Sequence, residues 1–189
     1  MKYTVKDYET RYYAGIEIEN GIDITAQTNS ISDTWSLLFH QYVDKIKEMV
    51  LSHQQEIEEA ISEDFGYRSP DETRITEILP ILNAIHYHRK HLHRWMKPQS
   101  RFSGLLFLPG KTKLLYQPLG IVGIIVPWNY PLYLALGPLI TAFAAGNRCM
   151  IKMSEYTPKL GALLEKICQQ YLGSELVQVI NGDVSTGRE

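Results

Sequence analysis

The amino-acid sequence predicts an α/β protein in which N-terminal helices precede half of a doubly wound parallel sheet. Two observations carry this prediction. Residues 121–126 form an apolar, mostly β-branched run without alternation, which is typical of a strand covered on both faces and therefore of a parallel sheet. Residues 119–189 continue in the order strand, helix, strand, helix, strand, which requires right-handed crossover connections.

The N-terminal third is predicted to be mostly helical. Alternating apolar and polar residues around Asn20-Gly21, within residues 16–25, fit either a short hairpin or an extended loop. Between Ile31 and Phe65, apolar residues recur at helical spacing and predict one buried stripe. The members of this stripe are Leu37, Leu38, Tyr42, Ile46, Met49, Val50, Ile57 and Ile61.

A second helix is expected to begin at Ser69-Pro70, because proline suits the first helical position and the carboxylates of Asp71 and Glu72 favour the first turn. Its expected buried face consists of Ile75, Ile78, Leu79, Leu82 and Ile85. Between Leu105 and Gln117, with Pro109-Gly110 at the centre, the pattern predicts a β-hairpin.

The sheet begins with the strand at residues 121–126, which Pro127 ends because proline lacks the N–H that a ladder needs. The Ala- and Leu-rich residues 132–145 predict a deeply packed crossover helix, with Gly146-Asn147 as its C-terminal stop. A second short strand is expected at residues 149–153.

Thr157-Pro158 predicts the N-cap and first turn of another helix, which keeps one apolar face as far as Gly173. A third strand is expected at residues 176–180. No G-x-G-x-x-G fingerprint, the usual mark of a dinucleotide-binding turn, occurs in the sequence. Open α/β sheets bind ligands beyond the carboxyl ends of their strands, which directs attention to Asn129 and Lys152.

Three motifs in this region resemble the aldehyde dehydrogenase superfamily over residues 114–187: PWNYP, AAGN, and a strand that ends in K-x-S-E-x-T-P. The preceding EDFGYRSPDETRITEILPILNAIHYHRKHLHRWMKP is similar to the class 3 branch, and nearest to coniferyl aldehyde dehydrogenases. The resemblance implies a helical region at residues 1–100, an oligomerisation-type hairpin at 101–118 and a truncated dinucleotide-binding core at 119–189. It also implies that the catalytic domain is absent and that the chain is the N-terminal part of a longer enzyme.

The resemblance assigns Asn129 a catalytic role, in which its side-chain amide donates to the oxyanion of a tetrahedral intermediate. Without the resemblance, an asparagine between Trp and Tyr-Pro is equally a turn residue. Lys152 and Glu155 would hold the adenosine ribose of a dinucleotide, against the alternative of a surface ion pair at a strand exit. Glu155 would repel a 2′-phosphate, so NAD is expected as cofactor, with NADP also possible.

The remaining cofactor contacts implied by the resemblance are Pro127 and Trp128 beside the nicotinamide, and Gly182 and Gly187 beside the adenine. For the two glycines, a turn is an equal explanation. The resemblance also implies an aldehyde substrate and a homo-oligomer. A second possible function is a non-catalytic dinucleotide-binding or dimerising module.

Aldehyde dehydrogenases use a cysteine nucleophile and a glutamate base, and both lie beyond the region that aligns here. Cys149, within a predicted strand, and Cys168, within a predicted helix, are expected to be small buried residues. The chain alone is therefore expected to be inactive. Two cysteines without a framework spacing and an N-terminus without an apolar segment indicate a cytoplasmic location.

Composition and charge exclude other classes of function. A net charge of −2 gives no basic face for nucleic acid. The uncharged stretch between Lys113 and Arg148 is interrupted by prolines, so no membrane span is expected. His88 and His91 could share a helix face, but no nearby carboxylate or cysteine completes a metal site, so no metal is expected.

Overall fold

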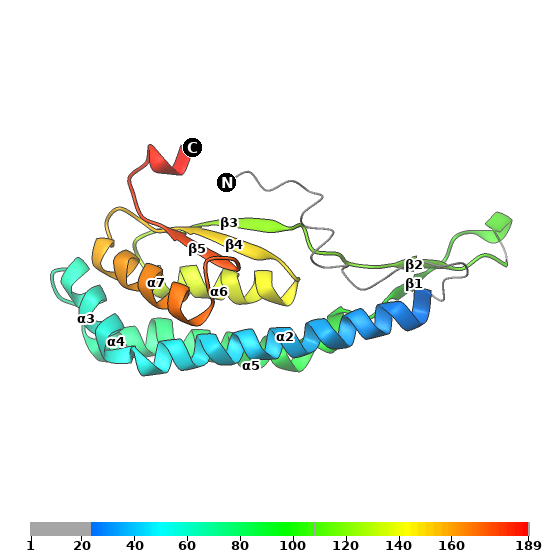
Figure 1. The fold of residues 1–189 in the computed structure, drawn as a ribbon, viewed down its shortest axis with the longest axis horizontal. Coiled ribbons are helices and arrows are strands. Elements are labelled where there is room, and N and C mark those ends of the chain that lie inside the picture. The colour runs from blue at the N-terminus through cyan, green and yellow to red at the C-terminus, as the bar shows by residue number, and fades with distance from the viewer. Residues whose placement is uncertain (1–23, 108, 189) are drawn as a thin grey trace.

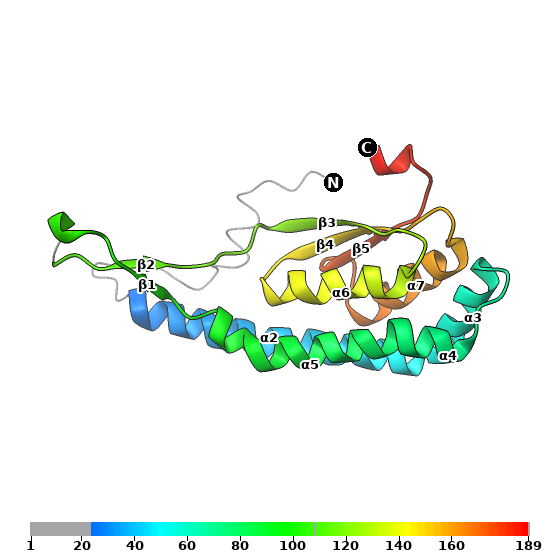
Figure 2. The same ribbon diagram turned by 180° about the vertical axis from the view of Figure 1, so that it is seen from behind.

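The computed structural model describes residues 24–107 and 109–188 and has three layers (Figure 1). A parallel sheet forms the first layer, two helices lie directly against it, and the N-terminal helices form the third. Figure 2 shows the same order from behind. The α/β class with a parallel sheet is therefore confirmed. The alternation predicted for residues 16–25 lies outside the described residues except at its end, where helix α2 already begins at Ile24.

The first predicted helical stripe belongs to two helices, α2 (Ile24–Ser52) and α3 (Gln54–Asp64), separated at His53. The buried side chains of α2 recur at a helical spacing. They are Phe39, Val43, Ile46, Met49 and Val50. The prediction that Leu37 is buried was wrong. Leu37 lies two residues before the buried Phe39, and residues two apart point to almost opposite sides of an α-helix.

The second predicted helix begins at Pro70 as expected and contains an irregular turn. Helix α4 (Pro70–Thr73) leads into a π-helical turn, η1 (Arg74–Ile78), and then into α5 (Leu79–Trp95). Pro80 cannot donate the N–H that an α-helix would pair with the carbonyl four residues earlier, which favours an irregular turn here.

The π turn changes which residues face the interior. Ile78 and Ile85 are buried as predicted, but the prediction of burial was wrong for Ile75 and Leu79, which are exposed. A π turn contains one residue more than a regular α-helical turn, so the residues after it face different sides of the helix than regular spacing predicts. As a result Glu77, a charged residue absent from the predicted stripe, becomes fully buried.

The predicted hairpin is present, but its first strand lies earlier than expected. Strand β1 (Gln99–Arg101) pairs antiparallel with β2 (Thr112–Leu114), and a short 3₁₀ turn, η2 (Leu105–Phe107), occupies the loop. The hairpin projects away from the layered body (Figure 1). Pro109-Gly110 lies in the loop between the two strands, near β2 rather than at the centre of the hairpin.

The parallel sheet has the order β3 (Ile121–Ile125), β4 (Arg148–Lys152) and β5 (Val177–Ile180). All three strands agree with the predicted positions to within a residue. They are connected by α6 (Pro131–Ala144) and α7 (Pro158–Tyr171), as predicted. The final short turn of the described chain is the 3₁₀ segment η3 (Thr186–Arg188).

The predicted stop at Gly146-Asn147 is confirmed by its geometry. Gly146 has a positive φ of 83°, which suits glycine after a helix. The buried side chain of Asn147 accepts hydrogen bonds from the N–H groups of Leu119 and Gly120 at 2.6 and 2.9 Å. It thereby ties the end of α6 to the chain that enters β3.

Strand β3 is not covered on both faces by the described residues, contrary to the prediction. Ile124 lies in the core with residues of α6, whereas Ile125 is 79% exposed and Ile121 and Met150 are also exposed. All described helices lie on one side of the sheet (Figures 1 and 2). Within the described ranges, none of the helices has the length and apolar character of a membrane span.

Carboxylates from the third layer cap both crossover helices. The backbone N–H groups of Leu132 and Tyr133, in the first turn of α6, donate to Glu77 Oε2 at 2.7 and 3.0 Å. Those of Lys159 and Leu160, in the first turn of α7, donate to Asp64 at 3.0 Å each. Negative charge at a helix N-terminus satisfies unpaired N–H groups and complements the helix dipole.

At α7, the cap from Asp64 replaces the N-cap that the sequence predicts at Thr157. Thr157 precedes α7 as predicted, yet its side chain makes no cap hydrogen bond and its hydroxyl donates instead to the carbonyl of Ser154 at 3.3 Å. The N-terminus of α7 therefore depends on Asp64, about a hundred residues earlier, rather than on its own N-cap.

We expect Asp64→Ala to lower the free energy of unfolding by about 1 kcal/mol, because two helix N–H groups lose their acceptor. Urea denaturation of the purified chain measures the change. The control is Glu63→Ala, whose exposed side chain pairs with Lys159 at 3.4 Å and which should cost less than about 0.5 kcal/mol. Equal losses for the two variants would contradict the capping role.

Candidate functional site

The carboxyl ends of the three parallel strands meet at one edge of the sheet, which is where such sheets bind ligands. Strand β3 leads into Pro127, Trp128 and Asn129, and β4 ends at Lys152. Gly182 follows β5. The fold therefore brings the predicted site residues from three separate segments to the same edge.

Lys152 joins two of these segments. Its ammonium group is mostly buried and donates to the carbonyl oxygen of Gly182 at 2.7 Å. The same group lies 3.6 Å from the carboxylate of Glu155. Gly187 is close by, since a Cβ at that position would lie 3.7 Å from Lys152 Cε. The three strand-end segments thus carry one positive and one negative group side by side.

The loop after β5 is organised by Asp183, which the sequence analysis did not identify. Its Oδ1 accepts hydrogen bonds from the N–H groups of Ser185 and Thr186 and from both hydroxyl groups. The hydroxyl of Ser185 is the main cause that lowers the pKa of Asp183. The signal was available, because aspartate two and three residues before such N–H groups is a common turn pattern.

Gly182 fits this loop for a steric reason. Its φ is 151°, and a Cβ there would collide with the side chain of Thr186. Glycine therefore permits the tight return of the chain beside Lys152. The turn explanation for Gly182, which the sequence left open, has direct geometric support.

The loop that carries Asn129 is exposed, including the side chains of Trp128 and Tyr130. This loop contacts Arg68, which lies in the connection between α3 and α4. The Arg68 guanidinium donates to the backbone carbonyl of Asn129 at 3.4 Å and lies over the rings of Tyr130 and Phe65, at 5.2 and 5.0 Å. These contacts hold the backbone at the carbonyl of Asn129 and the ring of the following residue, Tyr130.

Arg68 is itself held by Glu77. The two side chains are 4% and 0% exposed, and Arg68 Nη1 donates to Glu77 Oε1 at 2.8 Å. Burial raises the pKa of the Glu77 carboxyl, and the N–H group of Tyr133, the Arg68 charge and the N–H group of Leu132 oppose that rise. Sequence reasoning missed both residues, although a glutamate next to the buried Ile78 is an unusual member of an apolar helix face.

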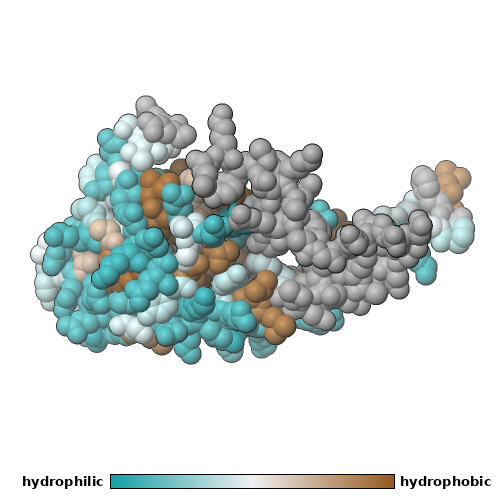
Figure 3. Space-filling model, in the orientation of Figure 1, coloured by the Kyte–Doolittle hydropathy of each residue, from teal (hydrophilic) through white to brown (hydrophobic). Residues whose placement is uncertain are grey.

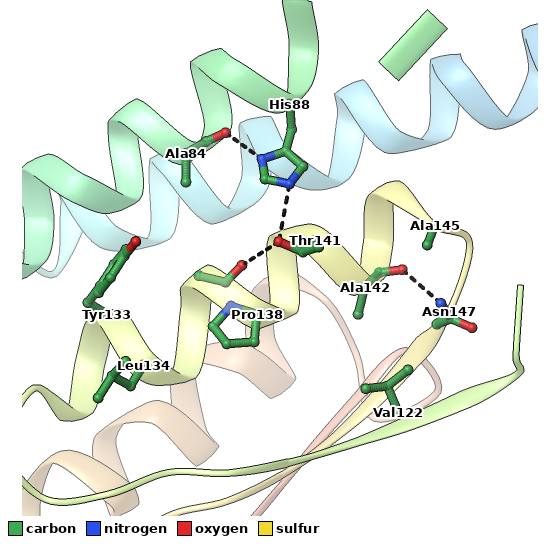
Figure 4. Close-up of a pocket in the computed structure, with 11 residues that line it drawn as sticks. Ala84, His88, Val122, Tyr133, Leu134, Pro138, Thr141, Ala142, Ala145 and Asn147 are labelled. Atoms are coloured by element: carbon green, nitrogen blue, oxygen red, sulfur yellow. Dashed lines mark hydrogen bonds between the residues drawn. The ribbon is translucent and has the colours of Figure 1, made fainter. Parts of the chain in front are cut away.

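An apolar groove runs along α6, from Tyr133 in its first turn to Asn147 just beyond its end (Figure 4). Its lining includes Val122 of β3 and Ala142 of α6, and His88 of α5 borders it. His88 Nδ1 lies 2.8 Å from the carbonyl of Ala84 and Nε2 lies 3.1 Å from the hydroxyl of Thr141. Both ring nitrogens of His88 therefore have protein partners.

Neither the histidine cluster nor the cysteines form an additional chemical site. The Nδ1 atom of His91 is bonded to the carbonyl of Tyr87, and residues 24–107 and 109–188 contain no group of three possible metal ligands. Cys149 and Cys168 are free and buried, as predicted, and burial raises the pKa of each thiol to about 12. A thiol of this kind is a poor nucleophile at neutral pH.

Residues 30–189 match the model of the aldehyde dehydrogenase family, so the chain belongs to that family. A probable coniferyl aldehyde dehydrogenase of Pseudomonas aeruginosa is 48% identical over 147 residues, which cover 78% of this chain and 31% of that protein. The coniferyl aldehyde dehydrogenase of a Pseudomonas species is 37% identical, with 77% and 30% covered. The chain thus spans about a third of the length of these relatives.

Solved structures share the fold. A substrate-bound structure of AldH from Staphylococcus aureus is 28% identical, with a TM-score of 0.76, and the match covers 88% of this chain and 38% of that one. An aldehyde dehydrogenase of Mycobacterium tuberculosis, complexed with NAD⁺, is 22% identical with a TM-score of 0.67 over 81% of this chain and 31% of that one. The latter likeness supports the fold alone.

Burial of the two thiols predicts their chemical behaviour. With pKa values near 12, roughly one thiol in 10,000 is ionised at pH 8, against about one in ten at the ordinary pKa of 9.0, so both should react with iodoacetamide about 1,000-fold more slowly in the native chain than in denaturant. Mass spectrometry of the alkylated chain measures this.

The same shift predicts how stability depends on pH. Because the pKa values are raised above 9.0 in the folded state, the stability contributed by these groups is complete below pH 9.0 and decreases as the pH rises toward about 12. In the alkylation experiment, rapid labelling of either cysteine in the native chain at pH 8 would show that it is not a core residue.

Proposed function

We propose that this chain is the dinucleotide-binding part of an NAD-dependent aldehyde dehydrogenase, which oxidises an aldehyde to the carboxylic acid. The observation that carries the proposal is the convergence of Asn129, Lys152 and Gly182 at one sheet edge. Coniferyl aldehyde or another aromatic aldehyde is the proposed substrate. The support for this class is the likeness to proteins named coniferyl aldehyde dehydrogenase.

Asn129 is proposed to act on the reacting carbonyl. Its amide N–H group is a neutral donor on an exposed loop whose backbone is held by Arg68. When a thiol attacks an aldehyde, negative charge develops on the carbonyl oxygen, and a donor placed there stabilises the transition state more than the bound substrate. This difference is what lowers the barrier.

Lys152 and Glu155 fit the ribose of a nicotinamide dinucleotide, which supplies a hydride acceptor when bound. An ammonium group can donate to sugar hydroxyls, and a carboxylate can accept from them. In the chain itself the Lys152 ammonium group donates to the carbonyl of Gly182 and lies 3.6 Å from the Glu155 carboxylate, so at most two of its N–H groups are available to a ligand. The negative charge of Glu155 disfavours the 2′-phosphate of NADP, so NAD is proposed as the main cofactor.

Pro127, Trp128, Gly182 and Gly187 are proposed to line the same cofactor. Trp128 offers an exposed ring that packs on its other side against Phe65, with ring centroids 6.3 Å apart. The glycines allow the backbone to approach a flat base. The loop contacts of Asp183 keep this segment in place beside Lys152.

The projecting hairpin supports a proposal of homo-oligomerisation. Its loop exposes large apolar side chains, among them Leu106 at 96%. Figure 3 shows apolar surface gathered at this tip. Exposed apolar surface of this kind marks sites of association, so a second copy of the chain is the proposed partner. A cytoplasmic location is also proposed, since both cysteines are free.

A second candidate function is a non-catalytic dinucleotide-binding or dimerising module. The observation that favours it is the burial of Cys149 and Cys168, which leaves no reactive thiol among the described residues. For the same reason we propose that the chain by itself does not oxidise aldehydes. The nucleophile and the general base would then belong to other parts of the enzyme.

In the full enzyme we expect Lys152→Ala to raise the Michaelis constant for NAD by about 10-fold or more, while that for the aldehyde changes less than about threefold, because the contact is made in ground and transition states alike. Steady-state kinetics with each substrate varied measures this. Lys159→Ala, which removes an exposed lysine at α7, is the matched control. An unchanged constant for NAD would refute the ribose assignment.

We expect Asn129→Ala to lower kcat by about 100-fold or more and to change NAD affinity only a few-fold, because the amide acts at the reacting carbon. Asn83→Ala on the exposed face of α5 serves as the control. An equal loss of NAD binding would instead identify Asn129 as a structural turn residue.

A further inference from the structure

Arg68 and Glu77 form a buried ion pair whose contacts extend to other segments of the chain. Both side chains are almost fully buried, and their charged groups are 2.8 Å apart. Removing two charges from water is costly, and apolar residues in place of a buried pair are often equally stable. The partners of this pair therefore deserve a functional explanation.

Several of the remaining contacts of the pair lead to the loop around Asn129, although Arg68 also contacts Glu72 and Thr76. Glu77 Oε2 accepts the N–H groups of Leu132 and Tyr133, on the C-terminal side of Asn129. Arg68 Nη1 donates to the carbonyl of Asn129 itself at 3.4 Å. A single charged pair thus holds the backbone at Asn129 and at the start of α6.

The π turn η1 directs the side chain of Glu77 toward Arg68. Glu77 lies within the turn, and its side chain points inward because of the altered helix phase. Thr76, its neighbour in the same turn, accepts a hydrogen bond from Arg68 Nη2 at 3.0 Å. Such turns often occur at functional sites. The irregular turn here presents both Glu77 and Thr76 to one guanidinium.

We propose that Arg68 and Glu77 are positioning residues that set the place of the Asn129 amide for catalysis. The proposal rests on the proposed oxyanion role of Asn129. Neither residue contacts substrate; the pair acts by fixing the loop backbone, and small displacements of a catalytic group lower the rate steeply. A residue that serves only folding would lower stability without acting through Asn129.

A double-mutant cycle in the full enzyme tests the proposal. Glu77→Gln keeps the size of the side chain and removes the charge that holds Arg68. It should lower kcat by about 10- to 100-fold while the Michaelis constant for NAD changes less than about threefold. In the Asn129→Ala enzyme, the same substitution should lower kcat by less than about threefold, because the group it positions is gone.

The chain offers a matched control in the Arg74–Glu58 pair. Arg74 belongs to the same π turn and lies 2.8 Å from Glu58, but it does not contact the Asn129 loop. Arg74→Gln should leave kcat within about twofold of the parent. A fall in kcat for Arg74→Gln as large as that for Glu77→Gln would overturn the proposal, since any perturbation of this helix would then suffice.

Arg68→Lys provides a second route in case Glu77→Gln fails to fold. A lysine keeps the positive charge beside Glu77, but it lacks the planar fork that also reaches Thr76 and the Asn129 carbonyl. It should lower kcat by about 10-fold, and again by less than about threefold in the Asn129→Ala enzyme.

The possible results separate the two proposals. If Asn129→Ala lowers kcat but its effect multiplies with that of Glu77→Gln or Arg68→Lys, the positioning role is wrong and the oxyanion role stands. If Asn129→Ala leaves kcat unchanged, the oxyanion role fails and the positioning role fails with it. A loss of kcat that disappears in the Asn129→Ala enzyme supports both.

Discussion

The structure depends on neutralising the N-termini of two crossover helices whose first turns are packed against other elements. Helix α6 obtains its acceptor from Glu77 and α7 from Asp64, and each carboxylate receives two backbone N–H groups. These carboxylates come from the outer helical layer, more than fifty residues earlier in the chain. The outer helices are therefore joined to the sheet by hydrogen bonds as well as by the apolar core.

The same caps determine how an anion can approach this part of the fold. In many dinucleotide-binding folds the pyrophosphate rests on the free N–H groups at the start of the first helix. Here Glu77 already occupies the N–H groups of Leu132 and Tyr133. The sequence also lacks a G-x-G-x-x-G turn, and Lys152 places a positive charge at the same edge of the sheet.

Two ion pairs that each have one partner in the π turn lie in different environments. Arg74 and Glu58 meet near the surface, where Arg74 and Gln54 offset the burial of Glu58 and lower the pKa of its carboxyl. For Glu77, burial is the dominant effect and the pKa is raised despite the Arg68 charge. The buried Arg68–Glu77 pair contacts the loop that carries Asn129, the residue proposed to act on the substrate. This contact fits the proposed role of the pair in orienting that loop.

The sequence by itself determined the β-α-β-α-β order and the positions of its strands, because apolar runs, prolines and Gly146-Asn147 are local signals. It also pointed to Asn129 and Lys152 as candidate site residues, and the structure places both at the carboxyl ends of strands. Only the tertiary structure decided that Arg68 and Glu77 hold the Asn129 loop and that Asp64 caps α7, since these contacts join distant segments. The burial of Glu77 likewise depends on a π turn, whose extra residue changes the helix phase in a way that regular periodicity cannot predict.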